Sequence, residues 1–430
     1  MRVVIIGAGL SGLSCAWHLL QAGVEAVVFE KENAVGGACR TLEREGFSFD
    51  LTGHLLHLRL EESWKLLAKL GLIKDLRAHN RRAGVYLAGR ITPYPIQIHT
   101  NRLPLGVVRD CLLGFIRAWR EPQREVASFG EWVLNRFGEG FAQHFFFPYN
   151  RKLFCTDPFS LSSEWVGRYV PRPSLEDVVE GALGIFPKGK AVGYNARFWY
   201  PRRGGIGILA QTLASPLRKL CLGTPVVALD LEAREVGLES GEKVVFDVLV
   251  ATNPLPQLVT MSRGVPQGLL QEAVVLKAVG VWNLNLAVRG RPKRREHWIY
   301  CPEETLPFYR VGFPSNHGRL APAGHHIISI EVSAPSGEAP ADSWEQRCIE
   351  ALVRAGFLAA PEDVLFHQVA VVDPAYVIFD HHRPRAVANL RSFFAQRRVY
   401  LCGRWAEWKY STMEDALWDG AAVARKILGR

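Results

Sequence analysis

Residues 3–12 read VVIIGAGLSG, and this stretch decides the fold. The apolar, β-branched run Val3–Ile6 predicts a short strand buried in a parallel sheet. It leads directly into a G-x-G-x-x-G loop and a helix that runs to about Ala22, and a second strand over 26–29 ends at Glu30. This order of strand, glycine loop, helix, strand and acid predicts a dinucleotide-binding unit of the Rossmann type.

Each position of that unit has a physical role. The first glycine permits a tight turn, the second lets the backbone approach a pyrophosphate, and the third lets helix and strand pack closely. The helix N-terminus adds positive potential, and the acid accepts hydrogen bonds from ribose hydroxyls. Glycines alone also occur in plain turns, but here strand, spacing and acid coincide. The dinucleotide-binding residues predicted in this unit are Gly7, Gly9, Leu10, Ser11, Gly12, Glu30 and Lys31.

The composition bounds the class of protein. The chain has 430 residues, 48% hydrophobic and 22% charged, which is typical of a soluble globular enzyme and excludes a disordered or collagen-like chain. At this length we expect two or three domains. Eight scattered cysteines without a C-x-x-C pair indicate a reducing, cytoplasmic compartment rather than a disulfide framework. No apolar run reaches the ~18–20 residues of a membrane helix, and glycines interrupt the apolar start, so neither a membrane span nor a signal peptide is expected.

The charge is basic, since 52 Lys and Arg against 42 Asp and Glu give a formal net charge of +10. One interpretation is solvated surface, because Arg81–Arg82 and Lys293–Arg295 form local runs. The other is an anionic small molecule, such as a phosphate-bearing cofactor or substrate. No stripe of basic residues alternates with aromatic residues at regular spacing, so nucleic acid is not expected as a partner.

A second glycine pair follows the acid. The segment Gly36–Thr41 reads GGACRT and resembles the extended fingerprint of the superfamily of FAD-dependent amine oxidases and protoporphyrinogen oxidases. The resemblance implies FAD rather than NAD, with the segment Phe47–His57 passing under the flavin ring. It also implies a strand near Val226 at the adenine and a C-terminal flavin segment that begins at Gly403. The FAD contacts implied in these segments are Gly36, Gly37, Arg40, Gly53, His54, Val226, Gly403, Arg404 and Met413.

The expected fold class is α/β, with a Rossmann-like FAD-binding domain of the glutathione-reductase type, an inserted helical subdomain and a substrate domain built on an antiparallel sheet. Amphipathic stretches at Gly106–Trp119, Phe129–Phe147 and Leu175–Leu183 predict the helices. Short β-branched runs such as Leu276–Leu286 and His326–Val332 predict the sheet. The predicted bounds are 1–90, 200–262 and 392–430 for the discontinuous FAD-binding domain, 91–199 for the helical subdomain and 263–391 for the sheet domain.

Within that superfamily, segments in the right order over nearly the whole chain resemble the UDP-galactopyranose mutases, especially their eukaryotic branch. No single segment is diagnostic, but together they are fairly specific. The segments are Tyr94–Gln97 (YPIQ), Pro148–Phe154 (PYNRKLF), Trp165–Gly167 (WVG), Tyr200–Gly205 (YPRRGG), Phe308–Arg310 (FYR) and Gly403–Tyr410 (GRWAEWKY).

This resemblance implies a ring contraction with no net redox change, in which N5 of the reduced flavin is the nucleophile that converts a UDP-linked hexopyranose to its furanose. The protein then supplies positioning and charge: arginines and tyrosines for the diphosphate and an aromatic slot for the base. By motif position, the implied catalytic residues are His54, Arg310, Tyr376 and Tyr410. The implied substrate-binding residues are Tyr94, Gln97, Asn150, Phe154, Arg168, Arg310, Tyr376 and Tyr410.

The chain departs from the family pattern at two places. The family's second diphosphate arginine falls where this chain has Tyr169, with Arg168 one residue earlier and Arg172 three later. On a helix, a shift of one residue rotates a side chain by about 100°, so Arg168 is not a direct replacement. Thr52 stands where the family has a glycine before the Gly-His step. These departures leave a related nucleotide-sugar open as the substrate.

Other interpretations stay open at this point. Taken alone, Tyr94 and Phe154 would be core aromatic residues and Arg310 a surface ion-pair member. His57 and the histidine pairs at 325–326 and 381–382 lack a carboxylate or cysteine at metal spacing, so no metal is expected. Two other functions remain: an FAD-dependent oxidase or desaturase of an amine or apolar substrate, and a non-catalytic FAD-binding protein. No separate NAD(P) motif is present, so NAD(P)H would serve only as an external reductant, and the oligomeric state is not predicted.

Overall fold

The N-terminal unit folds as the sequence predicts. The structure is a computed structural model that describes residues 1–122, 124–167, 169–185 and 196–429. In it, β1 (Val3–Ile6) is buried along its whole length and is followed by α1 (Leu10–Gln21). It pairs in parallel with β2 (Val27–Phe29), which ends just before Glu30. The predicted strand, helix and strand are therefore confirmed.

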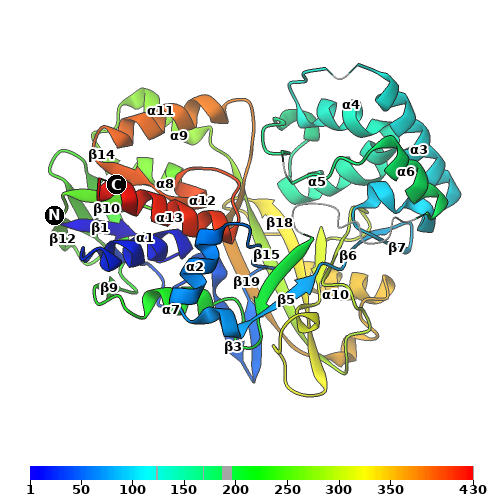
Figure 1. Ribbon diagram of the computed structural model, residues 1–430, viewed down its shortest axis with the longest axis horizontal. Helices are drawn as coiled ribbons and strands as arrows, with labels where there is room; N and C mark the ends of the chain where they lie inside the picture. Colours follow the sequence, from blue (N-terminus) through cyan, green and yellow to red (C-terminus); the bar gives the residue numbers. More distant parts are fainter. Residues whose placement is uncertain (123, 168, 186–195, 430) are drawn as a thin grey trace.

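The unit extends into a five-stranded parallel sheet with the order β20-β13-β1-β2-β9. The added strands are β9 (Leu220–Cys221), β13 (Val248–Ala251) and β20 (Val399–Leu401). The C-terminal helix α13 (Met413–Ile427) packs along α1, on the left in Figure 1. Segments from both ends and the middle of the chain thus build one sheet.

Further elements complete the cofactor lobe, by which we mean residues 1–82, 196–276 and 378–429. A second sheet has the order β12-β11-β10-β14, and β3 pairs with β4 and β5 with β8. The strands are β3 (Thr41–Arg44), β4 (Phe47–Asp50), β5 (Leu76–Asn80), β8 (Arg197–Pro201), β10 (Val226–Asp230), β11 (Glu235–Leu238), β12 (Lys243–Val245) and β14 (Ser262–Arg263). The helices are α2 (Glu61–Lys69), α7 (Ile208–Ala214), α8 (Leu255–Met261), α9 (Gln267–Val274), α11 (Arg383–Ala395) and α12 (Gly403–Ala406).

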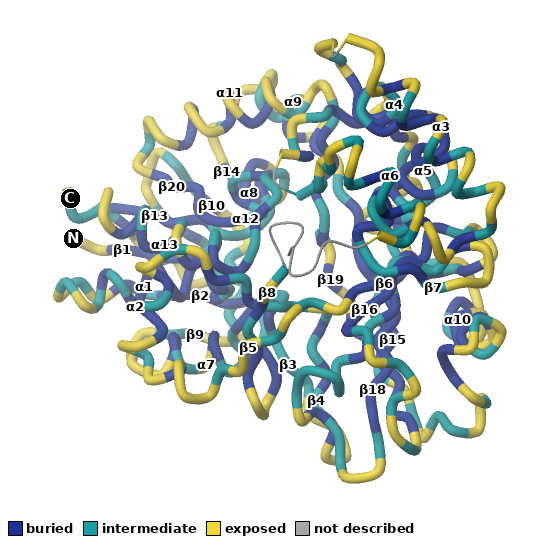
Figure 2. Tube along the Cα trace, turned by 45° about the vertical axis from the view of Figure 1, so that its right-hand side comes forward, coloured by how far each residue is buried: buried dark blue, intermediate teal, exposed yellow. Residues whose placement is uncertain are grey.

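A seven-stranded sheet forms the sheet lobe (residues 83–104 and 277–377), with the order β19-β15-β18-β17-β16-β6-β7. Its pairs are antiparallel except that of β16 with β6. Figure 2 shows long buried stretches in β15 and β18, and α10 (Trp344–Arg354) shares a core with them. The strands are β6 (Ala83–Leu87), β7 (Arg90–Pro93), β15 (Ala278–Arg289), β16 (Trp298–Tyr300), β17 (Arg310–Gly312), β18 (His325–Pro335) and β19 (Val364–Val377).

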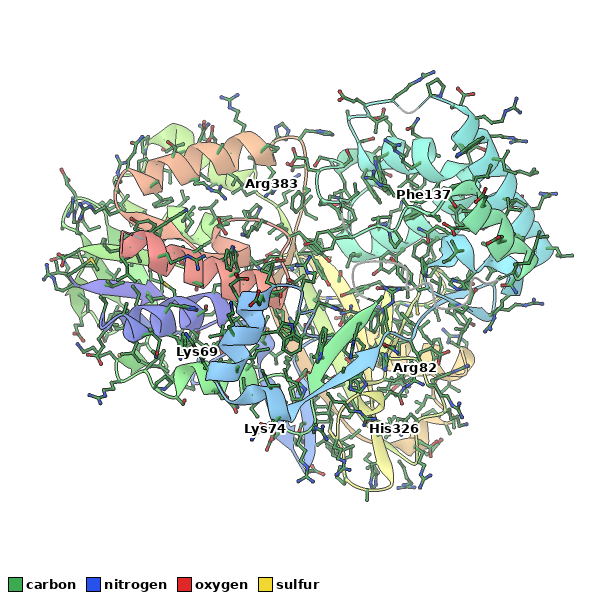
Figure 3. The ribbon with its side chains drawn as sticks, in the orientation of Figure 1. Lys69, Lys74, Arg82, Phe137, His326 and Arg383 are labelled. Carbon is green, nitrogen blue, oxygen red and sulfur yellow. The ribbon has the colours of Figure 1, made fainter. Side chains whose placement is uncertain are left out.

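The helical lobe (residues 105–185) carries α3 (Leu105–Arg120), α4 (Phe129–Phe141), α5 (Phe147–Phe154) and α6 (Leu175–Leu183). The helix predicted over Phe129–Phe147 is not continuous, because Gly138 has φ 75° and a π-helical turn follows over 142–146. Close packing against α3 accounts for the break, since a Cβ on Gly138 would overlap the backbone of Gly114. Figure 3 shows Phe137 among the helices of this lobe, where it is buried.

The lobes differ at their edges from the predicted domain bounds. The boundary predicted at residue 90 falls inside the β6–β7 hairpin, which pairs with β16 in the sheet lobe. The predicted sheet domain, 263–391, includes α9 and α11, whose apolar side chains share a core with β1 and β13 of the cofactor lobe. We therefore propose the three lobes defined here as the domains of this chain.

The length and composition of the helices decide whether one of them could span a membrane. Among the described residues, no helix combines the length and the apolar character that crossing a bilayer requires.

Candidate cofactor and substrate site

The glycine loop leaves a space that a cofactor fits. Gly7 has φ 101°, and a Cβ on Gly12 would overlap the carbonyl oxygen of Gly7, so the fold itself needs glycine at both positions. Gly9 is different, because its φ is −73° and a Cβ there would meet nothing within 4 Å. Gly9 lines the cavity in front of α1. Its missing side chain therefore leaves room for a ligand rather than for a neighbouring residue.

The second glycine pair closes the other side of this space. Gly36 has φ 114°, and its N–H donates to the carbonyl of Ala8 at 2.8 Å, which holds the two glycine segments side by side. A Cβ on Gly37 would lie 3.3 Å from the Cα of Gly9. The pyrophosphate of a dinucleotide fits between two backbone segments of this kind.

A cavity of about 940 Å³ extends from the glycines past the ends of β1 and β2. Glu30 lines it and is held in place by the N–H of Ala8, which donates to its Oε2 at 2.7 Å. Arg40 lines the same cavity and pairs with Glu32 at 3.1 Å. The adenosine and phosphate half of FAD fits along the wall of this cavity that Glu30 and Arg40 form. The predicted cofactor-binding residues that line this cavity are Gly7, Gly9, Glu30, Lys31, Gly37, Arg40 and Val226.

The C-terminal segment closes the cradle from the opposite side. Gly403 has φ 86°, and a Cβ there would overlap the side chain of Ser11, so glycine is needed because α12 approaches α1 closely. Gly403 and Gly12 line neither cavity, and we propose that they shape the site without contacting the cofactor. The predicted cofactor-binding residues that line the main cavity are Gly9, Leu10, Ser11, Gly36, Gly53, His54, Arg404 and Met413.

A second cavity, which we call the main cavity because the predicted catalytic residues line it, measures about 330 Å³ and lies where the three lobes meet. The glycine loop lines one end, Tyr149 of α5 reaches in from the helical lobe, and residues of β15, β17, β18 and β19 form another wall. The predicted residues Arg310, Tyr376 and Tyr410 all line it. The structure thus brings the predicted arginine and tyrosines to the same space as the predicted flavin contacts.

Arg310 is held by a buried acid that the sequence analysis missed. Arg310 on β17 faces Glu331 on β18, and its Nη2 lies 2.5 Å from Oε1 of that carboxylate. The hydroxyl of Tyr309 and the N–H of Gly53 also donate to Glu331. The carboxylate is 3% exposed, so its charge is stabilised by these partners rather than by water.

The charge state of this pair follows from its contacts. Burial works to raise the pKa of Glu331, but the Arg310 guanidinium and the hydrogen bonds from Tyr309 and Gly53 outweigh it and lower the pKa of the carboxyl. Glu331 is therefore ionised at neutral pH and fixes the Arg310 side chain at the cavity wall. A glutamate in the middle of the apolar run His325–Pro335 is the signal that could have revealed it, because a buried charge requires a partner.

Arg404 connects the two predicted tyrosines. Its guanidinium carbon lies 5.0 Å from the ring centre of Tyr376 and 4.8 Å from that of Tyr410. Its Nε donates to the carbonyl of Ala375 at 3.1 Å and its Nη1 to that of Ser411 at 2.9 Å. One arginine therefore fixes the ends of the two segments that carry the tyrosines, beside the predicted flavin position.

His54 is neutral in this site. Its Nδ1 lies 2.9 Å from the hydroxyl of Thr52, the residue that departs from the family pattern. Burial is the main cause that lowers the pKa of His54 to about 4, against the opposing effect of Glu331. An uncharged ring at neutral pH fits a contact with an apolar cofactor ring better than it fits proton exchange.

Of the described residues predicted for the nucleotide end of the substrate, one lines a cavity and three do not. Phe154 lines the larger cavity, and its ring centre lies 6.3 Å from that of Tyr376. Tyr94, Gln97 and Asn150 line neither cavity, and the Asn150 amide donates to the carbonyl of Phe146 within the helical lobe. The Gln97 Oε1 atom is buried and has no hydrogen-bond partner among the described residues. Arg168 lies outside the described residues.

The position of the family's second arginine is occupied by an aromatic contact. The Tyr169 ring packs edge-on against Tyr410, with ring centres 4.5 Å apart. Arg172 lies over the ring of Trp132 at 5.3 Å and lines neither cavity. In the part of the chain that the structure describes, the main cavity therefore holds two arginines, Arg310 and Arg404.

Two thiols face the same cavity. Cys39 and Cys402 line it and are buried. Burial, with the nearby Asp50 carboxylate, raises the pKa of Cys39 to about 12, and burial raises the pKa of Cys402 as well. Both therefore stay protonated at neutral pH. All eight cysteines are free, and no group of three or more potential metal-ligating side chains is present among the described residues.

Three histidines form a cluster beside the cavity, which the sequence analysis did not identify. The ring centres of His79, His297 and His317 lie 5.7 to 6.3 Å apart. Each ring has one buried nitrogen without a hydrogen-bond partner among the described residues. Burial is the main cause that lowers the pKa of all three, that of His297 to about 3. The cluster is therefore neutral at neutral pH.

We expect this cluster to make folding sensitive to acid. An unfolded histidine takes up a proton below its ordinary pKa of 6.5, whereas His297 does so only near 3. Stability is therefore lost as the pH falls from about 6.5, by up to about 1.4 kcal/mol per pH unit for each such ring. In urea unfolding between pH 6 and 4, His297→Gln should give a shallower pH dependence of the free energy of unfolding. The amide keeps an acceptor for the Arg82 N–H, which donates to His297 at 3.1 Å.

The matched control for that measurement is His381→Gln, because His381 is exposed. This substitution should leave the pH dependence unchanged. An identical slope for wild-type protein and His297→Gln would contradict the assignment of the acid sensitivity to the cluster.

The glycine cradle and the two cavities that it borders have the shape and the residues of a dinucleotide-binding site. Over residues 10–428 the chain matches the family described as flavin containing amine oxidoreductase, and it belongs to that family. The family match supports FAD as the cofactor, while NAD(P)H as an external reductant stays a prediction.

Solved structures narrow the resemblance. A crystal structure of reduced UDP-galactopyranose mutase is 28% identical, with a TM-score of 0.94, and the match covers 100% of this chain and 95% of that one. Putrescine oxidase bound to putrescine is 16% identical, with a TM-score of 0.66 over 100% and 99% of the two chains, and shows the shared fold alone. The predicted α/β fold class is confirmed. The chain is thus a UDP-galactopyranose mutase-like member of its family, as the sequence motifs predict.

Curated relatives in sequence carry other activities. A 4,4'-diapolycopene oxygenase of Methylomonas sp is 23% identical over 265 aligned residues, and the match covers 56% of this chain and 51% of that protein. A 4,4'-diaponeurosporene oxygenase of Staphylococcus haemolyticus is 44% identical over 55 residues, 13% of this chain and 11% of that protein. The match thus spans about half the length of the first of these relatives and a short segment of the second.

Proposed function

We propose that this protein is a flavin-dependent nucleotide-sugar mutase that converts a UDP-linked hexopyranose to its furanose without net redox change. The observation that carries the proposal is the meeting of Arg310, Arg404, Tyr376 and Tyr410 in one cavity with the Gly53–His54 step. The similarity to a reduced UDP-galactopyranose mutase over the whole chain supports it.

In this proposal the residues of the chain bind and orient the cofactor and the substrate, and reduced FAD, when bound, supplies the nucleophile, its N5 atom. The glycine cradle, Glu30 and Arg40 would hold the adenosine and phosphate half of the cofactor. Arg310 and Arg404 would neutralise the diphosphate of the substrate, and the hydroxyls of Tyr376 and Tyr410 would donate hydrogen bonds to it. Their joint effect is to stabilise the diphosphate as a leaving group.

The aromatic wall would exclude water from the reacting sugar. Tyr149 lies between Tyr300, at 5.3 Å between ring centres, and Tyr309, at 6.2 Å. All three line the cavity, and burial raises the pKa of each. Tyr149 and Tyr300 therefore remain neutral donors for sugar hydroxyls, whereas the Tyr309 hydroxyl donates to Glu331. The three rings keep bulk water away from an opened sugar.

The direct test is an assay of dithionite-reduced and oxidised enzyme with UDP-galactopyranose under anaerobic conditions. We expect UDP-galactofuranose, separated by chromatography, from the reduced enzyme alone. Arg310→Lys should lower kcat/KM at least about tenfold, because a lysine lacks the forked donors that bind a diphosphate. Arg172→Lys is the matched control, since Arg172 lies over Trp132 outside the cavity. Absence of furanose with a panel of UDP-hexopyranoses would count against the proposal.

One observation favours a second function. The aromatic pair Tyr169–Tyr410 stands where a mutase has its second diphosphate arginine, and the two curated relatives described above are a 4,4'-diapolycopene oxygenase and a 4,4'-diaponeurosporene oxygenase. An FAD-dependent oxidoreductase of a small amine or apolar substrate would use such a wall. It would consume oxygen with substrate and would not require prior reduction, so an oxygen electrode distinguishes it from the mutase.

A further inference from the structure

Helix α3 presents an apolar and cationic face to solvent. Leu105, Leu113 and Trp119 are 86%, 44% and 57% exposed, which is high for large apolar side chains. At about 100° per residue, these three and the half-buried Leu112 and Ile116 fall within roughly one third of the helix circumference. The opposite face is buried against the rest of the helical lobe.

Arginines share that exposed face. Arg109 and Arg120 are exposed and lie among the apolar positions of the arc, and the exposed Arg117 lies at its border. Arg109 pairs with Asp110 at 2.8 Å, outside the arc, while Arg117 and Arg120 form no ion pair with the described residues. Leucine, tryptophan and arginine on one face, without an acidic residue inside it, are the composition of a helix that lies in a membrane interface.

From this face we infer that the protein docks on an anionic lipid surface through α3. Leu105, Leu113 and Trp119 would enter the headgroup region, and Arg117 and Arg120 would contact lipid phosphates while their stems lie along the apolar boundary. Figure 1 shows α3 at the outer edge of the helical lobe, on the side away from the cofactor lobe. The whole helix can therefore approach a flat surface.

Charge and shape select this occupant over others. In a two-fold contact the same face of a second copy would meet this one, and because the face carries arginines and no acidic residue, it offers that copy no complementary charge. The helix face is convex and its residues line neither of the two cavities, so it offers no pocket for a small ligand. The net charge of +10 adds a general attraction to an anionic bilayer.

The test is sedimentation of the full chain with bound FAD on lipid vesicles at about 0.1 M salt, where surface charge still acts. We expect binding to phosphatidylcholine vesicles with about 30% phosphatidylglycerol to exceed binding to pure phosphatidylcholine at least about fivefold. The pairs Leu105→Ser with Trp119→Ser, and Arg117→Gln with Arg120→Gln, should each lower binding to anionic vesicles at least about fivefold. Val274→Ser is the control, because Val274 on α9 is 79% exposed outside this face.

Flavin content per chain and far-ultraviolet circular dichroism show whether each variant is folded. If the double variant Leu105→Ser with Trp119→Ser does not fold, Leu105→Ser alone, at the first residue of α3, is tested in its place. Equal binding to both kinds of vesicle, or wild-type binding by the folded variants, would overturn the proposal. So would a dimer in light scattering that Leu105→Ser with Trp119→Ser dissociates, because α3 would then contact a second copy.

Discussion

The variant Glu331→Gln is expected to lose about 3–5 kcal/mol of folding free energy. Glu331 is 3% exposed, and its carboxylate accepts from Arg310, Tyr309 and Gly53. The amide keeps the shape of the side chain but removes its charge, which leaves the partly buried Arg310 guanidinium without a counter-charge. Chemical unfolding at saturating FAD measures the loss.

A variant that lacks both charges separates the effect of the ion pair from general disruption. Arg310→Met with Glu331→Leu removes both charges, and this variant should be more stable than Glu331→Gln, since an uncompensated buried charge costs more than a neutral pair. If Glu331→Gln loses less than about 1 kcal/mol, Arg310 has another counter-charge and Glu331 does not hold it.

The variant Gly9→Val should fold and yet purify almost without flavin. A Cβ at Gly9 would meet nothing within 4 Å in the protein, so we expect the fold to tolerate a small side chain, which would occupy the space between the two glycine segments. We expect FAD binding to weaken at least about 100-fold, which corresponds to about 2.7 kcal/mol. Visible flavin absorbance per chain gives the loss, and far-ultraviolet circular dichroism monitors the fold.

Gly268→Val is the matched control. Gly268 on α9 is exposed, and a Cβ there also meets nothing within 4 Å, but it lines neither cavity. The control should bind flavin like the wild type. Full flavin occupancy in Gly9→Val would show that the cofactor lies elsewhere.

Local signals predicted much of the cofactor lobe. The run Val3–Ile6 and the glycine loop lie within a few residues of one another, so propensity and spacing suffice, and the strand has the predicted bounds. The helix over Phe129–Phe147 failed for the opposite reason. Its break at Gly138 depends on close contact with Gly114 on α3, and contacts between distant segments leave no periodicity in the sequence.

The site residues also divide into those that a local motif predicts and those that depend on contacts between distant segments. Arg310, Tyr376 and Tyr410 were predicted from motifs and line one cavity. Glu331 and the histidine cluster were missed, because each depends on which strands pair. The register that sets Arg310 opposite Glu331 comes from β17 and β18, and neither residue signals it alone.

The two protonated thiols that line the main cavity affect how readily the protein is oxidised by peroxide. Reduced flavin reacts with dioxygen to give hydrogen peroxide, and peroxide oxidises thiolates far faster than thiols. Cys39 and Cys402 line that cavity, but burial keeps both in the thiol form. Cys155 is exposed and lines the larger cavity instead of the main one, and partial burial of its thiol raises its pKa less far, to about 11. We therefore expect oxidation to begin at Cys155 rather than at the thiols nearest the source of the peroxide.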